Sequence, residues 1–287
     1  MSDSVPFAWR AGRVRAGGVT LATFTTGSRA SDASVVLLLH GLGHWSEASW
    51  GRVVPLLDPA LRYVALDLPG FGASEKPAAP YDTAYFLAAL GAAVAELDLR
   101  TFALVGHSLG GFIAAQYAGA QPDRVARLAL ISPAGFSRTP RYVVFALASV
   151  LAPWVFTRPP SRSFVRRTLE RSVADPAALD PAVVEQAYEL SQELGLRKAF
   201  AAVYVSALRT FARRPALHAG FARYRGPVFC AWGAHDRFTS PATLRDVVRI
   251  YPQAQTLLLP RSAHLPMIEE PGALAAALRA FLASTSP

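Results

Sequence analysis

The chain has 287 residues, of which 52% are hydrophobic and 17% are charged, and its formal net charge is +9. This length and balance are typical of one large globular domain or of one domain with an insertion, and they exclude a disordered protein. The single cysteine, Cys230, excludes an internal disulfide. The first residues contain no basic segment followed by an apolar one, so we expect no secretory signal peptide and a cytoplasmic protein.

The first half of the chain alternates between strand and helix patterns. We expect two strands within residues 7–27, forming an antiparallel edge, and a strand buried on both faces at 35–39. A helix near 46–57, a strand at 61–66 and a helix at about 83–97 with Thr83 as its N-cap follow. Alternation of this kind predicts an α/β fold with a doubly wound, mostly parallel sheet.

A serine between glycines comes next, in Gly-His-Ser-Leu-Gly-Gly at 106–111. The apolar run 102–105 precedes it and the helix-forming run 112–118 follows it. This G-x-S-x-G spacing between a strand and a helix is that of a nucleophile elbow, whose tight turn forces the serine to positive φ. The sequence therefore predicts Ser108 as a catalytic nucleophile.

The second half contains further strand patterns, separated by a long segment without them. Strands are expected at 125–131, 228–232 and 256–259, whereas residues 133–215 are predicted to be helices interrupted by prolines. Within this segment, the run 142–157 is apolar and uncharged, but it is too short for a membrane span, which needs about 20 residues.

A serine nucleophile needs a base, and the base needs a carboxylate to orient it. Between residues 225 and 268 the only acids are Asp236 and Asp246, and one of the two histidines is His264. Asp236 and His264 each follow a strand-like run, whereas Asp246 falls on the solvent side of a predicted helix. We therefore predict that Asp236 and His264 project from the sheet edge that carries Ser108. The other nearby histidines, His107 and His235, are predicted to be wall or supporting residues.

The oxyanion of an acyl-transfer reaction needs two N–H donors. Gly41 allows the chain after the 35–39 strand to bend, so that the amide of Leu42 points inward beside that of Leu109. The role of His40 is then structural. His40 and His44 lack a third ligand at suitable spacing, so we expect no metal and no cofactor.

Five segments in this order resemble the α/β-hydrolase family. They are residues 40–43, 67–74, 106–111, 232–236 and 264–266. The resemblance implies an eight-stranded α/β-hydrolase core formed by 1–132 and 216–287, with 133–215 as a helical cap. The chain order Ser–Asp–His is that of this family.

The resemblance also bears on the reaction. Haloalkane dehalogenases and epoxide hydrolases of this family have aspartate at the elbow, whereas this chain has Ser108. We therefore expect a serine hydrolase that cleaves carboxylic esters of hydrophobic acyl or aromatic groups through an acyl-enzyme. Similar chains also cleave carbon–carbon bonds or lactones, carry out perhydrolysis, or serve as slow small-molecule receptors. Peptidase action on N-terminal proline is disfavoured because the cap has no acidic cluster.

The positive charge is concentrated in or near the cap. Residues 133–225 contain 14 Lys and Arg against 6 Asp and Glu. Basic residues near apolar ones favour weak contact with an anionic membrane surface. The plainer interpretation is that the apolar run packs on the core and that the arginines reflect a base-composition bias. No nucleic-acid-binding motif accompanies the charge, so nucleic acid is not expected as a partner.

Overall fold

The computed structural model describes residues 8–30, 33–136, 158–212 and 214–284. Its strands are β1 (Arg10–Ala16), β2 (Val19–Gly27), β3 (Val35–Leu39), β4 (Arg62–Leu66), β5 (Phe102–His107), β6 (Val125–Ile131), β7 (Val228–Gly233) and β8 (Gln255–Leu259). Its α-helices are α1 (Ser46–Trp50), α2 (Thr83–Glu96), α3 (Leu109–Ala120), α6 (Arg162–Glu170), α7 (Pro181–Ser191), α8 (Leu194–Ala212), α9 (Arg214–Phe221), α10 (Leu244–Ile250), α11 (Pro266–Glu269) and α12 (Pro271–Ala283). Short 3-10 turns are η1 (Val54–Leu56), η2 (Pro122–Arg124), η3 (Pro176–Ala178) and η4 (Pro241–Thr243).

The described strands form one eight-stranded sheet in the order β1-β2-β4-β3-β5-β6-β7-β8. β1 pairs antiparallel with β2, and β2 pairs antiparallel with β4. The remaining neighbours are parallel. The predicted fold class, including its antiparallel edge, is confirmed.

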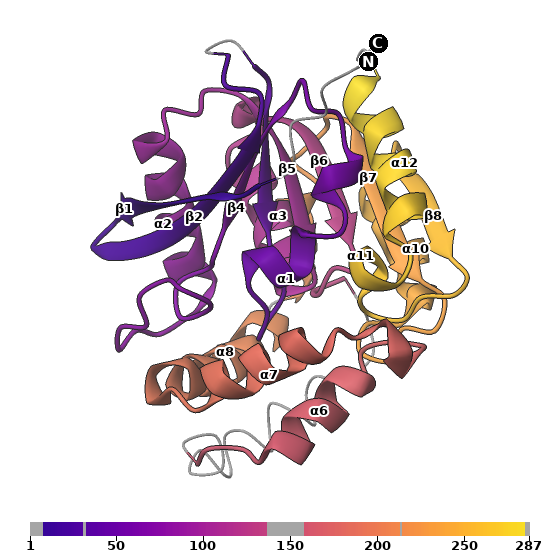
Figure 1. Cartoon of the computed structure of the whole chain (residues 1–287). Helices are drawn as coiled ribbons and strands as arrows, with labels where there is room; N and C mark the ends of the chain where they lie inside the picture. The colour runs from indigo at the N-terminus through magenta and orange to yellow at the C-terminus, as the bar shows by residue number, and fades with distance from the viewer. Residues whose placement is uncertain (1–7, 31–32, 137–157, 213, 285–287) are drawn as a thin grey trace.

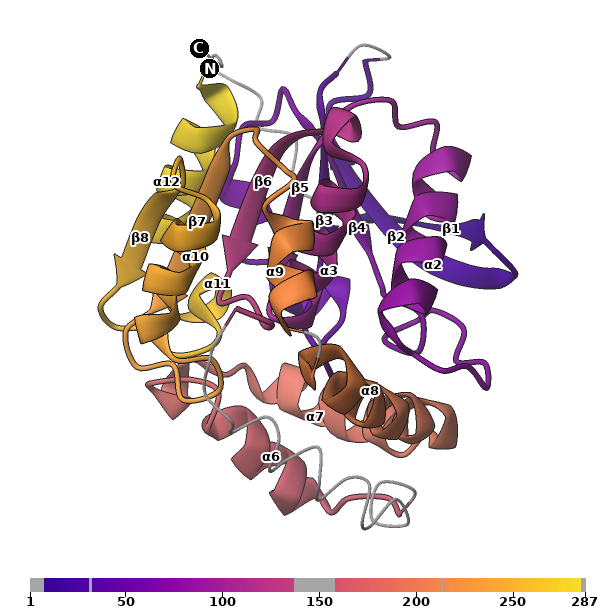
Figure 2. The same cartoon turned by 180° about the vertical axis from the view of Figure 1, so that it is seen from behind.

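Helices cover both faces of this sheet. Figure 1 shows α1, α11 and α12 in front of the sheet, and Figure 2 shows α2, α3, α9 and α10 in front of the opposite face. This double cover explains why the central strands are apolar throughout rather than alternating, since neither of their faces meets water.

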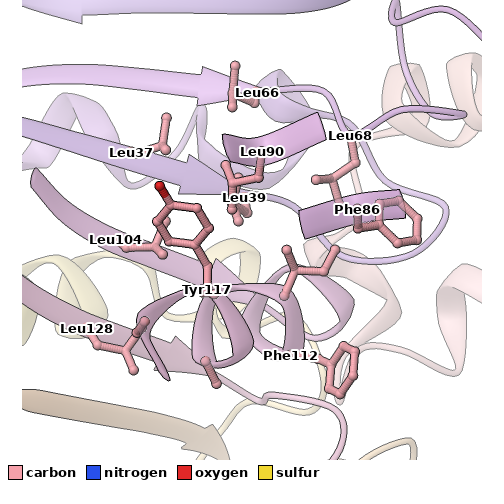
Figure 3. Close-up of a cluster of buried hydrophobic side chains, with 14 of the residues drawn as sticks. Leu37, Leu39, Leu66, Leu68, Phe86, Leu90, Leu104, Phe112, Tyr117 and Leu128 are labelled. Carbon is pink, nitrogen blue, oxygen red and sulfur yellow. The ribbon is translucent and has the colours of Figure 1, made fainter. Parts of the chain in front are cut away.

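Successive side chains of a strand point to opposite faces of the sheet. Leu37 and Leu39 of β3 therefore join the hydrophobic cluster shown in Figure 3, whereas Val36 and Leu38 join the cluster on the other face. Burial of each such side chain contributes about 1.5–3 kcal/mol.

Two local predictions were wrong. The helix expected near 46–57 is divided: α1 ends before its C-cap Gly51, and η1 begins separately at Val54, with Pro55 in its first turn. The N-cap of α2 is Asp82 rather than Thr83, since the Asp82 carboxylate accepts a hydrogen bond from the Tyr85 N–H at 2.9 Å. A carboxylate is as good a cap as a hydroxyl, so only the backbone dihedrals distinguish the two.

A helical insert separates β6 from β7. Within it, α6, α7 and α8 lie together beyond the carboxyl ends of the parallel strands (Figures 1 and 2). α9 returns to the sheet and packs on α3, where a Cβ at Gly119 would lie 2.1 Å from the Gly220 carbonyl oxygen. The apolar run 142–157 lies outside the described residues.

The close contact between α3 and α9 yields a test with two matched glycines. We expect Gly119→Ala to destabilise the protein by about 1–3 kcal/mol, because the methyl group must push the two helix backbones apart. Gly91→Ala in α2 should instead stabilise it by up to about 1 kcal/mol, since no atom lies within 4 Å of its Cβ position. Equilibrium urea unfolding measures both free energies. Unchanged or increased stability of Gly119→Ala would contradict a tight α3–α9 contact.

Candidate active site

The turn between β5 and α3 holds Ser108 in a left-handed backbone conformation, with φ 51° and ψ −113°. A Cβ at Gly106 would lie 2.4 Å from the Gly110 carbonyl oxygen. A Cβ at Gly110 would lie 2.5 Å from the carbonyl oxygens of Leu39 and His40. Glycine is therefore required at both positions for the chain to turn so closely.

The structure brings together the three residues predicted to react. His264 Nε2 lies 3.0 Å from Ser108 Oγ, and His264 Nδ1 lies 2.8 Å from Asp236 Oδ2. A carboxylate can only accept, so Nδ1 carries the proton and Nε2 presents its lone pair to the serine hydroxyl. This is the tautomer that a general base needs.

The Asp236 carboxylate is held by the loop that follows it. Its Oδ1 accepts hydrogen bonds from the N–H groups of Phe238 (2.8 Å) and Thr239 (2.9 Å), and its Oδ2 accepts one from Thr239 Oγ1 (2.7 Å). Burial raises the pKa of Asp236, but His264 and Thr239 outweigh this effect, so the net pKa is lower than usual. The carboxylate therefore stays ionised beside His264.

The two predicted oxyanion donors come from segments in contact with Ser108. Leu109 is the first residue of α3, so its N–H has no acceptor within its own helix. Leu42 follows Gly41, at which a Cβ would lie only 3.1 Å from the Ser108 Cβ. Both segments border the serine, as an oxyanion site requires.

Other buried histidines lie around Ser108, His264 and Asp236, and they stay neutral. Leu68 N–H donates to His40 Nε2 at 2.9 Å, and His40 Nδ1 then donates to the Gly41 carbonyl at 2.8 Å. Burial lowers the pKa of His40, and it lowers that of His44 to about 3, with further contributions from the neighbouring rings His40 and His264. These rings therefore add no positive charge near Ser108.

His107 supports His264 directly. Its Nε2–H donates to the His264 carbonyl oxygen at 2.8 Å, and the two ring centroids are 4.9 Å apart. Burial, followed by the nearby His264 and His44, lowers the pKa of His107 well below its usual range. In His235, the other histidine predicted to support the site, the backbone N–H donates to the carbonyl oxygen of Ser262, in the loop after β8.

Sequence reasoning missed two aromatic side chains that border the site. Phe238 is 41% exposed, and its ring lies 5.3 Å from the His264 ring. Phe200 of α8 contacts the loop that carries Leu42, since a Cβ at Gly43 would lie 2.5 Å from the tip of its ring. No local pattern distinguishes either residue from an ordinary core phenylalanine.

The described residues contain no cluster of three or more His, Cys, Asp or Glu side chains arranged to hold a metal ion. Among the same residues, every helix is too short or too polar to cross a bilayer.

The chain is similar in sequence to parts of several known proteins. The chain is 36% identical to an uncharacterized protein of Mycobacterium tuberculosis over 121 residues, which are 42% of this chain and 35% of that protein. It is 33% identical to 2-hydroxymuconate semialdehyde hydrolase of Pseudomonas over 175 residues, 59% of this chain and 58% of the enzyme. The matches thus span between about a third and three fifths of these relatives.

A solved structure matches over more of the chain. It is that of a membrane phospholipase A described as a bacterial virulence factor, with a TM-score of 0.76, 27% identity, and coverage of 96% of this chain and 86% of that one. A family model for the alpha/beta hydrolase fold matches residues 34–271. The chain therefore belongs to the α/β hydrolase fold family.

Proposed function

We propose that the protein is a serine hydrolase that cleaves carboxylic esters of hydrophobic acyl or aromatic groups through an acyl-enzyme. The observation that carries this proposal is the hydrogen-bonded line from Ser108 through His264 to Asp236, with contacts of 3.0 and 2.8 Å. The exposed ring of Phe238 beside His264 supports an apolar substrate.

In the proposed reaction, His264 Nε2 takes the Ser108 proton as Oγ attacks the ester carbonyl carbon. Asp236 stabilises the imidazolium that forms, and the N–H groups of Leu42 and Leu109 stabilise the oxyanion. Each such donor contributes about 3–4 kcal/mol to the transition state in comparable sites. His264 then protonates the leaving alcohol and later activates water against the acyl-enzyme.

A carbon–carbon bond hydrolase is the second candidate, because the similarity to 2-hydroxymuconate semialdehyde hydrolase includes 59% of this chain. The substrate class distinguishes the two candidates. A ring-opened aromatic dienone loses its visible absorbance when it is cleaved, whereas p-nitrophenyl esters report ester hydrolysis. A ligand that stabilises the protein without turnover would indicate a receptor instead.

We expect Ser108→Ala to lower ester turnover by at least about a thousandfold, because the nucleophile is lost while the fold stays intact. Initial rates on p-nitrophenyl esters from acetyl to palmitoyl measure this effect and the preferred acyl length. Circular dichroism verifies folding of the variant. Undiminished hydrolysis by folded Ser108→Ala protein would exclude the proposed mechanism.

Asp236→Asn should lower kcat by about 10²- to 10⁴-fold, less than the serine change, because it removes charge and tautomer control but leaves the nucleophile.

Asp236→Asn should also remove a contribution to the stability of the native state. Since the pKa of Asp236 is lowered in the fold, its charged form stabilises the native state above its unfolded pKa, and this contribution disappears as pH falls. Thermal unfolding of both proteins from pH 3 to 7 tests this: the difference should grow with pH.

We further propose that the helical insert acts as a cap over the site and that α6 contacts an anionic lipid surface. The Ser161 hydroxyl accepts the Phe164 N–H and caps α6. The outward stripe of α6 includes Phe164, 58% exposed, and the exposed Arg167, and the exposed C-cap residue Arg171 follows it. The opposite side of α6 faces α7, where Arg162 forms an ion pair with Glu185. An exposed aromatic residue beside arginines matches an anionic surface in both polarity and charge.

Vesicle sedimentation at low salt tests this contact. We expect binding to vesicles of phosphatidylcholine with phosphatidylglycerol, and none to phosphatidylcholine alone. The double variant Phe164→Ser/Arg167→Glu should lose it, because each arginine contributes about 1 kcal/mol and the apolar anchor is gone. Arg279→Glu on α12 is the matched control. No wild-type binding, or equal loss with the control, would refute the contact.

A further inference from the structure

The main chain of His264 is held by two segments outside its own loop. Its N–H donates to the carbonyl oxygen of Ser172, in the insert just after α6, at 2.9 Å. Its carbonyl oxygen accepts the His107 Nε2–H at 2.8 Å. The histidine that faces Ser108 is therefore hydrogen-bonded directly to the insert on one side and to the nucleophile turn on the other.

Glu269, at the end of α11, joins the insert to the loop of His264 through its side chain. One carboxylate oxygen, Oε2, accepts the Ala263 N–H at 2.7 Å. The other, Oε1, accepts the N–H groups of Ala174 at 2.6 Å and Asp175 at 3.2 Å. Hydrogen bonds to an ionised acceptor are about twice as strong as neutral ones, so this carboxylate is a strong link between the insert and the loop of His264.

Packing strengthens this link. Val173 of the insert belongs to the same buried cluster as Leu265, next to His264. The guanidinium of Arg52 donates to Ala178 in the insert at 2.9 Å and to Ile268 in α11 at 3.1 Å. The segment after α6 is thus joined to the histidine loop by the Ser172 and Glu269 hydrogen bonds and to α11 through Arg52.

We propose that Glu269 is a positioning residue that couples the insert to His264. A displacement of segment 172–175 then also displaces the His264 imidazole. The inference rests on the proposed function in one respect, namely that Ser108 reacts with the help of His264. Its consequence is that the position of the insert sets the reactivity of Ser108, whatever the substrate. A shift of about 1 Å in a reacting group lowers a rate by as much as about a hundredfold.

The adjacent Glu270 is a matched control. Its carboxylate accepts the Arg261 N–H at 3.0 Å and the Ser262 hydroxyl at 2.7 Å, so it holds the start of the same loop. Arg261 and Ser262 both belong to that loop, whereas the Glu269 carboxylate also reaches Ala174 and Asp175 of the insert. Comparing substitutions of the two glutamates therefore distinguishes the effect of supporting the loop from the effect of connecting the loop to the insert.

The experiment compares Glu269→Gln, Glu269→Ala and Glu270→Gln with the wild type. Two rates are measured: turnover of p-nitrophenyl butyrate, and phosphonylation of Ser108 by a small fluorophosphonate. In the second, the Oγ–P bond forms, the P–F bond breaks, fluoride leaves and His264 takes the hydroxyl proton. Hydrogen exchange by mass spectrometry reports the peptides that contain residues 172–175 and 263–264.

We expect Glu269→Ala to lower kcat and the phosphonylation rate by the same factor, about tenfold or more, with KM nearly unchanged. Glu269→Gln should have a smaller effect in the same direction, and Glu270→Gln should change either rate by less than about threefold. Exchange should become faster at 172–175 and 263–264 together in Glu269→Ala.

Three results would overturn the proposal: unchanged rates in folded Glu269→Ala, equal losses in the Glu269→Gln and Glu270→Gln variants, or faster exchange at 263–264 while 172–175 stays protected. Failure of the proposed function is a separate result. In that case wild-type protein would not hydrolyse esters, yet the effect of Glu269 on phosphonylation could still be measured.

Discussion

The left-handed backbone of Ser108 is the constraint on which the site depends. A non-glycine residue at φ 51° is strained, and such strain persists only where the surroundings hold it. Here the Ser108 N–H donates to the Ile131 carbonyl, and the Ser108 carbonyl accepts the N–H groups of Phe112 and Ala134, each at 3.0 Å. The turn is thus fixed to β6 on one side and to the start of α3 on the other, and the hydroxyl is left facing His264.

Charge around this turn is organised by burial. The imidazoles of His40, His44 and His107 are buried, and burial lowers the pKa of each, so they act as neutral hydrogen-bonding groups. Asp236 keeps its charge because His264 and Thr239 compensate for its desolvation. The imidazolium that forms in the proposed reaction therefore meets one fixed negative charge and no competing positive one among these three rings.

The helical insert is connected to this site in two ways. Phe200 of α8 lies against Gly43 in the loop that carries Leu42, and Ser172 accepts the N–H of His264. The insert therefore contacts the segment of a proposed oxyanion donor and the segment of the proposed base. The alignment of these two groups therefore depends in part on contacts with the insert, which is why we place the control of reactivity there.

The sequence by itself determined the features that arise from local sterics and periodicity. The sharp turn at Ser108 requires glycine at 106 and 110, and the apolar run of β3 requires burial on both faces. Only the tertiary structure decided the contacts between residues that are far apart in the sequence. His264 is 156 residues from Ser108. The strand patterns predicted that both lie at one edge of the sheet, but their 3.0 Å contact also depends on the loop lengths and packing of the folded chain, which no local pattern encodes. The same holds for Phe238 and Glu269, because their roles come from the surfaces that the folded chain brings beside them.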